Sequence, residues 1–248
     1  MPTSSRKQFS TRMLLAALLL GVAVVSTRVR GARAHYHEHD DDDEDAEPVP
    51  ITCGSIIKLR HKATGFRLHS HQVQWGSGSG QQSVTALDKA DDPNSYWTVK
   101  EGHGQASCVR GEPVQCGATV RLEHSPTQRN LHSHNYRSPL SSLQEVSCFG
   151  EGQGEGDRLD DWELECVDAQ ATGGVWHRSA EVRLHHPGTR RYLYTTEGNK
   201  FTNRNCPRCP IVGQLEIACH PSRAAGADNV WYVDEGIFFG GLEEGTEF

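Results

Sequence analysis

The sequence has few apolar and few aromatic residues for its 248 positions: hydrophobic side chains make up 35% and aromatic ones 7%. That share is low for a large layered α/β protein, and no long window places apolar residues at helical spacing. Twenty-five glycines and eleven prolines favour many short elements joined by turns. The length alone allows one large domain or two ordinary ones.

The chain also lacks an excess of positive charge. Its formal net charge is -7, and acidic residues crowd into positions 38–47. Without a basic stripe to neutralise phosphates, nucleic acid is excluded as a partner. No glycine-rich loop with a lysine precedes a helix, so nucleotide binding is not expected, and we expect no cofactor and no metal ion. The absence of any Asn-X-Ser/Thr triplet after the N-terminal segment excludes N-glycosylation.

A long apolar run occurs only near the N-terminus, within residues 1–34. Basic residues precede an apolar stretch at 13–26, and Ala32-Arg33-Ala34 offers a small-residue cleavage site. This pattern predicts a secretory signal peptide over 1–34, with an uncleaved anchor as the alternative. After cleavage no membrane span is expected, and the secretory route permits disulfide bonds.

Both ends of the remaining chain are polar. Residues 35–50 combine alternate histidines with an acidic block, which predicts a disordered, solubilising arm, because like charges repel and nothing apolar can collapse. Weak binding of a divalent ion by these histidines is the alternative. Residues 240–248 form an acidic C-terminal tail.

Between these ends, a pattern recurs three times, over about 51–107, 108–172 and 173–235. Apolar residues align in all three copies, as at Leu68, Leu131 and Leu193. Their period-two alternation predicts strands, about four in each copy and about twelve in total. Three such units must bury their faces against one another, and closing the sheet removes exposed edges. The sequence therefore predicts an all-β, three-repeat β-trefoil over 51–239, and a β-propeller is disfavoured because it usually needs more blades.

Local motifs recur between residues 51 and about 239. They are Arg67-Leu68-His69-Ser70-His71 and Asn94-Ser95-Tyr96-Trp97 in the first copy, Asn130-Leu131-His132-Ser133-His134 and Leu159-Asp160-Asp161-Trp162 in the second, and Trp231 with Glu235-Gly236-Ile237-Phe238 in the third. These motifs resemble those of the MIR-repeat family and, within it, of the stromal cell-derived factor 2 proteins. One departure is the C-terminus, Gly245-Thr246-Glu247-Phe248, where the family usually carries a receptor-read retrieval tetrapeptide.

The resemblance implies a non-catalytic adaptor for protein folding and quality control. Such a protein binds a J-domain co-chaperone and a BiP-type chaperone in the endoplasmic reticulum lumen, and it holds unfolded or misfolded clients soluble. Secretion is the alternative location. A carbohydrate-binding MIR module is the alternative function, since MIR repeats are also attached to protein O-mannosyltransferases. A thiol-disulfide oxidoreductase acting through Cys206 and Cys209 is a further alternative.

Eight cysteines suit an oxidising compartment. Cys108 and Cys116 bracket a turn between the first two copies, which predicts a disulfide between them; Cys53 and Cys166 are the next candidate pair. Cys148 and Cys219 occupy equivalent repeat positions and are expected to be buried thiols. Cys206-x-x-Cys209 lies in a proline-rich insertion of the third copy, where a local disulfide or half of a zinc site is favoured over redox catalysis.

Two His-Ser-His motifs give the candidate binding surface. Alternate residues of a strand share a face, so each pair could chelate a metal. No third ligand recurs with both pairs, which favours a structural role or contacts in a polar groove, with no catalytic residue. The three repeat tryptophans are expected in the core. The candidate surface consists of Arg67, His69, His71, Trp75, His132, His134 and Tyr136.

Overall fold

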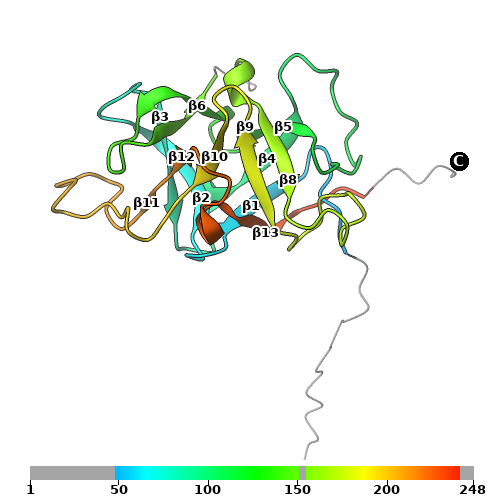
Figure 1. The fold of residues 1–248 in the computed structure, drawn as a ribbon. Coiled ribbons are helices and arrows are strands. Elements are labelled where there is room, and N and C mark those ends of the chain that lie inside the picture. The colour runs from blue at the N-terminus through cyan, green and yellow to red at the C-terminus, as the bar shows by residue number, and fades with distance from the viewer. Residues whose placement is uncertain (1–47, 151–154, 241–248) are drawn as a thin grey trace, which may run out of the picture. The chain divides into compact units, whose positions relative to one another are not determined.

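The structure is a computed structural model that describes residues 48–150 and 155–240 (Figure 1). The expected signal peptide at 1–34, the arm up to residue 47 and the tail from residue 241 lie outside the described residues. Within the described ranges, no helix is long and apolar enough to cross a membrane.

The described chain forms thirteen β-strands and three short 3-10 helices, and contains no α-helix. The all-β prediction is confirmed. The strands are β1 (Ile56–His61), β2 (Arg67–Gln74), β3 (Gln82–Leu87), β4 (Trp97–Glu101), β5 (Thr119–His124), β6 (Arg129–Arg137), β7 (Gln144–Phe149), β8 (Trp162–Cys166), β9 (Val182–His186), β10 (Arg191–Tyr194), β11 (Leu215–Glu216), β12 (Ala218–His220) and β13 (Trp231–Ile237), and the 3-10 helices are η1 (Pro93–Ser95), η2 (Arg158–Asp160) and η3 (Gly226–Asn229).

Part of this sheet closes on itself. Strand β1 pairs with β4, β4 with β5, β5 with β8, β8 with β9, β9 with β13, and β13 returns to β1. All these pairings are antiparallel, and the strands lie beside one another in Figure 1. A closed ring leaves these strands no free edge along the paired stretches, which removes a route to edge-to-edge aggregation.

The other strands form hairpins that pair with one another. Strand β2 pairs with β3, β6 with β7, and β10 with β12. Strand β3 also pairs with β7, β7 with β12, and β11 with β3. Hairpins distant in sequence are therefore held side by side, which creates the polar boundaries described below.

The alternating apolar residues fill one core. In β8, Trp162 and Leu164 are fully buried and the residue between them is not, as the period-two pattern requires. The tryptophans Trp97, Trp162 and Trp231 are also fully buried, as expected. Each indole N–H donates to a backbone carbonyl, at 2.9, 2.9 and 3.2 Å, so no tryptophan carries an unpaired donor into the core.

A histidine and a threonine define the same turn at three places. The pairs are His61 with Thr64, His124 with Thr127, and His186 with Thr189, with Nδ1 to hydroxyl distances of 3.0, 2.7 and 2.7 Å. The residue after each threonine has a positive φ of 73°, 53° and 57° respectively. Only the first of these is glycine (Gly65), so the histidine–threonine bond fixes a conformation that Gln128 and Arg190 adopt at some cost.

The pairing of four cysteines corrects the sequence prediction. The disulfides are Cys53–Cys108 and Cys116–Cys166, not Cys108–Cys116 and Cys53–Cys166. The chain before β1 is bonded to the chain before β5, through Cys53 N–H to the Glu112 carbonyl at 2.8 Å. The chain around Cys116 is bonded instead to residues 164–174. Each of these cysteines therefore pairs with a cysteine from a segment that is distant in sequence but adjacent in space. The two cysteines on either side of one turn do not pair with each other.

The remaining cysteines agree with their favoured interpretations. Cys206 and Cys209 form a local disulfide with each other. Cys148 and Cys219 are free and buried, and burial raises the pKa of each thiol to about 12, which keeps them protonated. They behave as small core residues.

Candidate functional site

The structure does not place the seven residues of the expected binding surface on one exposed face, because most of them are buried. Arg67 is 7% exposed, and its Nε donates to Asp234 Oδ2 at 2.9 Å. Its Nη1 also donates to the Asp88 carbonyl at 3.3 Å. This guanidinium ties β2 to β13, so its assignment to an exposed surface was wrong.

Trp75 is likewise inside the protein. It is 6% exposed and donates from Nε1 to the Val146 carbonyl at 2.9 Å. It packs against Phe201 and Ile211 in a second apolar cluster, beside the Cys206–Cys209 disulfide. The insertion in the third copy covers this indole, which sequence reasoning could not foresee from the position of Trp75 alone.

The first histidine pair is mostly enclosed. His69 Nδ1 lies 2.8 Å from Asp92 Oδ2, and the rings of His69 and His71 are 5.0 Å apart. Burial lowers the pKa of both histidines; Asp92 opposes that shift, more strongly at His69. Both ring nitrogens of His71 are buried without a hydrogen-bond partner among the described residues. Two neutral imidazoles are the consequence.

The second pair belongs to a chain of hydrogen bonds. His132 Nδ1 lies 2.8 Å from Asp160 Oδ1, and its Nε2 lies 3.2 Å from His134 Nδ1. His134 Nε2 then lies 3.1 Å from Glu145 Oε1. Both carboxylates are fully buried, so the chain joins β6 to β7 and to the turn at η2. Only Tyr136, 52% exposed and edge-on to His134, faces solvent.

Around this series of hydrogen bonds, three side chains have ligand atoms close enough to hold a metal ion. Atoms of His132, Asp157 and Asp160 lie within 4.8 Å of one another. Asp160 is already engaged, because Oδ2 accepts the backbone N–H of Asp157 at 2.7 Å and the amide of Asn130 at 3.3 Å. The capping box that these bonds complete accounts for the arrangement without an ion.

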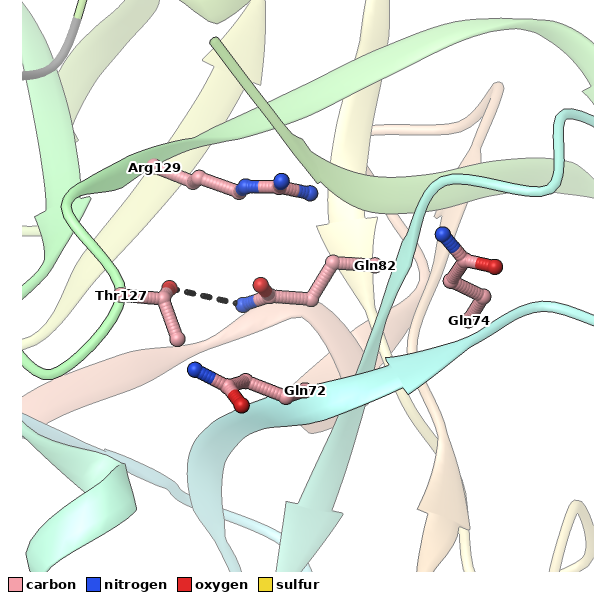
Figure 2. A pocket seen from close by; sticks show the side chains of 5 residues that line it. All are labelled: Gln72, Gln74, Gln82, Thr127 and Arg129. Carbon is pink, nitrogen blue, oxygen red and sulfur yellow. Dashed lines mark hydrogen bonds between the residues drawn. The ribbon is translucent and has the colours of Figure 1, made fainter. Parts of the chain in front are cut away.

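A polar pocket that sequence reasoning missed lies between the β2–β3 hairpin and the β5–β6 turn (Figure 2). We call it pocket A; it has a volume of about 370 Å³. Gln82 lies at its centre, 3% exposed, and Nε2 donates to Thr127 Oγ1 at 2.9 Å and to Ser70 Oγ at 2.8 Å. Figure 2 shows Arg129 and Gln72 on either side of this amide. Pocket A is lined by Gln72, Gln74, Gln82, Thr127 and Arg129.

A second pocket, pocket B, has the same design between the β6–β7 hairpin and the β9–β10 turn; its volume is about 230 Å³. Gln144 takes the place of Gln82, and Nε2 donates to Ser133 Oγ at 2.7 Å and to Thr189 Oγ1 at 2.8 Å. Arg191 takes the place of Arg129. Pocket B is lined by Asn135, Tyr136, Arg137, Ser142, Leu143, Gln144 and Arg191.

A periodic signal could have revealed both pockets. Gln82 and Gln144 each stand two residues before an aligned core valine, and Arg129 and Arg191 each stand two residues before an aligned core leucine. The apolar members of this period mark the core, and its polar members mark the two pockets.

Comparison with known proteins gives a consistent result. The MIR domain model matches residues 74–161. Stromal cell-derived factor 2-like protein 1 of Mus musculus is 48% identical over 188 residues, 76% of this chain and 78% of the mouse protein. Stromal cell-derived factor 2 of Homo sapiens is 47% identical over 188 residues, 76% of this chain and 82% of the human protein. The crystal structure of the SDF2-like protein from Arabidopsis thaliana has a TM-score of 0.71 and 42% identity, and covers 79% of this chain and 100% of the plant chain.

Proposed function

The chain belongs to the stromal cell-derived factor 2 family of MIR-domain proteins, and on that premise we propose that it is a non-catalytic adaptor in protein folding and quality control. It binds a J-domain co-chaperone and, through it, a BiP-type chaperone, and the complex holds unfolded or misfolded clients soluble. The observation that carries this proposal is the identity of nearly half over most of the chain.

The fold suggests how such an adaptor works. A closed ring of strands is a rigid platform, and its hairpins and turns can present a fixed surface to a partner. Release of clients is driven by the ATPase of the partner. The site of action that we propose is the endoplasmic reticulum lumen, with secretion as the alternative. Three disulfides support an oxidising compartment.

We further propose that the domain is a β-trefoil made of three MIR repeats. Three features that recur support this: the tryptophan-to-carbonyl bond, the histidine–threonine turn, and the hairpin that follows each turn.

Affinity capture tests the adaptor function. The disulfide-bonded protein is used as bait in an extract of endoplasmic reticulum lumen, and the same protein, reduced and alkylated, is the unfolded control. We expect mass spectrometry to find a J-domain protein and a BiP-type ATPase with the folded bait, the latter released by ATP. Recovery of neither protein, or of equal amounts with the alkylated control, would contradict the proposal.

Carbohydrate binding is the second candidate, and pocket A favours it because its lining offers amides, a hydroxyl and a guanidinium to sugar hydroxyls. Elution of captured proteins by free mannose would support this function. The third candidate, thiol-disulfide exchange, rests on Cys206 and Cys209. Insulin reduction that disappears in Cys206→Ser would support it, whereas no activity would remove it.

A further inference from the structure

The amide groups of pockets A and B are held in one orientation by a relay of hydrogen bonds. At pocket A, His124 Nε2 lies 3.0 Å from the Asn94 carbonyl, which can only accept, so Nε2 carries the proton. Nδ1 is then an acceptor, and the Thr127 hydroxyl must donate to it. The same hydroxyl oxygen accepts from Gln82 Nε2.

Ser70 completes the relay. Its hydroxyl donates to the Ser83 carbonyl at 2.8 Å, so its oxygen is free to accept the other Nε2–H of Gln82. Both amide hydrogens of Gln82 are thereby used, and the amide cannot flip without losing two bonds. Its Oε1 has no hydrogen-bond partner among the described residues, and Figure 2 shows it on the side of Arg129.

Pocket B repeats every step. His186 Nε2 lies 2.9 Å from the Leu159 carbonyl, so Thr189 donates to Nδ1 and accepts from Gln144. Ser133 donates to the Glu145 carbonyl at 2.7 Å and accepts the second hydrogen of Gln144. Gln144 is 4% exposed, and its Oε1 is buried without a partner in the described structure. A buried acceptor in this state is costly unless a ligand or water supplies a donor.

The third boundary, where the third copy meets the β1–β2 turn of the first copy, lacks this design. His61 and Thr64 keep the turn, and the Thr195 hydroxyl still donates to the Glu216 carbonyl at 2.8 Å. However, Leu215 stands where the other copies have glutamine, and Phe66 stands where they have arginine. The fold therefore tolerates an apolar pair at this place, and the polar pair in pockets A and B is not required for folding.

The lining decides which ligand fits. Oε1 needs a donor, and the neighbouring guanidinium of Arg129 or Arg191, which has no hydrogen-bond partner among the described residues, needs an acceptor. A carboxylate would leave Oε1 unpaired, and a cation would be repelled by the guanidinium. No acidic side chain lines either pocket. The complementary group is neutral and carries a donor beside an acceptor, as a peptide group does and as adjacent sugar hydroxyls do.

The spacing of the pockets favours a peptide. Gln82 pairs with Cys148 on β7, and Gln144 stands four residues before Cys148 on the same strand. At about 3.3 Å per residue along β7, the two glutamines lie roughly 14 Å apart, which an extended peptide of about five residues also spans. A single sugar ring cannot reach both pockets.

We propose that pockets A and B are two halves of one docking site for the main chain of an extended polypeptide. Gln82 and Gln144 accept backbone N–H groups, and Arg129 and Arg191 donate to backbone carbonyls. Recognition of the main chain does not depend on client sequence. The inference rests on the proposed role in holding unfolded clients and assigns that role to a defined surface.

Fluorescence anisotropy tests this site on the disulfide-bonded protein purified from a eukaryotic secretory host. The probe is a labelled dodecapeptide of Gly, Ser and Thr, compared with its N-methylated form and with a dipeptide. We expect the N-methylated and the two-residue probes to bind about tenfold more weakly or worse, because the first lacks donors and the second cannot span both pockets.

Variants place the binding in the pockets. We expect Arg129→Gln with Arg191→Gln to weaken dodecapeptide binding about tenfold, the size expected for hydrogen bonds to a charged group. Arg204→Gln with Arg208→Gln removes the same charge from an exposed loop and should leave binding unchanged. Gln82→Leu with Gln144→Leu reproduces the third boundary and should also weaken binding. If the glutamine double variant fails to fold, the arginine variants still test whether the peptide binds in the pockets.

Three outcomes would overturn the proposal: no binding of the dodecapeptide by the wild-type protein, equal binding by the arginine variant, or displacement of the peptide by mannose. The same arginine variant is also used as bait for the J-domain co-chaperone. This second measurement separates failure of the docking-site proposal from failure of the adaptor proposal. Intact capture without peptide binding refutes the pockets alone, whereas peptide binding without capture refutes the adaptor role alone.

Discussion

Buried histidines are the residues whose ionisation the fold controls most directly. Burial lowers the pKa of His124 to about 4 and the pKa of His186 to about 4. In each case Nδ1 accepts from a threonine hydroxyl, and a proton on Nδ1 would break that bond. Ionisation of these residues and formation of their turns are therefore linked.

Stability should fall in mild acid because of these histidines. The unfolded chain takes up protons near pH 6.5 and the folded chain does not, so the stabilisation is complete above that pH and is lost as the pH falls towards 4. Each histidine contributes about 3 kcal/mol to that loss. Urea denaturation of wild type and His124→Gln, from pH 7.5 to 4.5, should show a shallower slope in the variant. Parallel slopes would contradict this linkage.

The core tryptophans provide a second test at this scale. We expect Trp162→Ala to lower the free energy of unfolding by about 3–5 kcal/mol, since it removes a fully buried indole and leaves the Leu131 carbonyl without its donor. Tyr136→Ala, at an exposed position, should cost about 0.5 kcal/mol or less. Chemical denaturation measures both. A cost below that of the tyrosine control would place Trp162 outside the core.

At the scale of elements, the disulfides clamp segments that the strand ring brings together. Cys116–Cys166 joins residues 50 positions apart, and Cys206–Cys209 joins residues three apart. Cys116→Ser with Cys166→Ser should destabilise the protein by about 2–5 kcal/mol, because a cross-link that closes a long loop restricts the unfolded chain most. Cys206→Ser with Cys209→Ser should cost less.

Thiol labelling checks the pairing itself. In a Cys108→Ala variant, alkylation and peptide mapping should find the new free thiol at Cys53, the partner seen in the structure. Labelling at Cys116 would instead support the pairing expected from the turn, and would contradict the structure.

Elements were predictable where their signal was local. The alternation around Ile57 and Leu59 fixed a strand, and the repeat tryptophans marked the core. Contacts between copies were not predictable. The cover over Trp75, the ion pair of Arg67 with Asp234 and the partner of Cys53 all depend on which segments become neighbours, and strand alternation does not encode that. The pockets differ from these contacts, because Gln82 and Gln144 recur at one repeat position and could have been found from the sequence.

At the scale of the whole molecule, closure of the ring depends on its last strand. We expect truncation after Asn229, which removes β13, to abolish cooperative unfolding, because β1 and β9 both lose a partner. Truncation after Gly240 keeps the strand and should leave the transition intact. Near-UV circular dichroism during thermal unfolding measures both. A sharp transition in the shorter protein would show that the ring is dispensable.

The pairing of β1 with β13 has a consequence for biosynthesis. Strand β1 leaves the ribosome long before its partner β13, so the ring of strands cannot close until β13 has been made. Hairpins such as β6–β7 can form early because their partners are adjacent in sequence. Until β13 is made, β1 and β9 each lack a partner, and we expect the nascent protein itself to need the kind of protection that we propose it later helps to give.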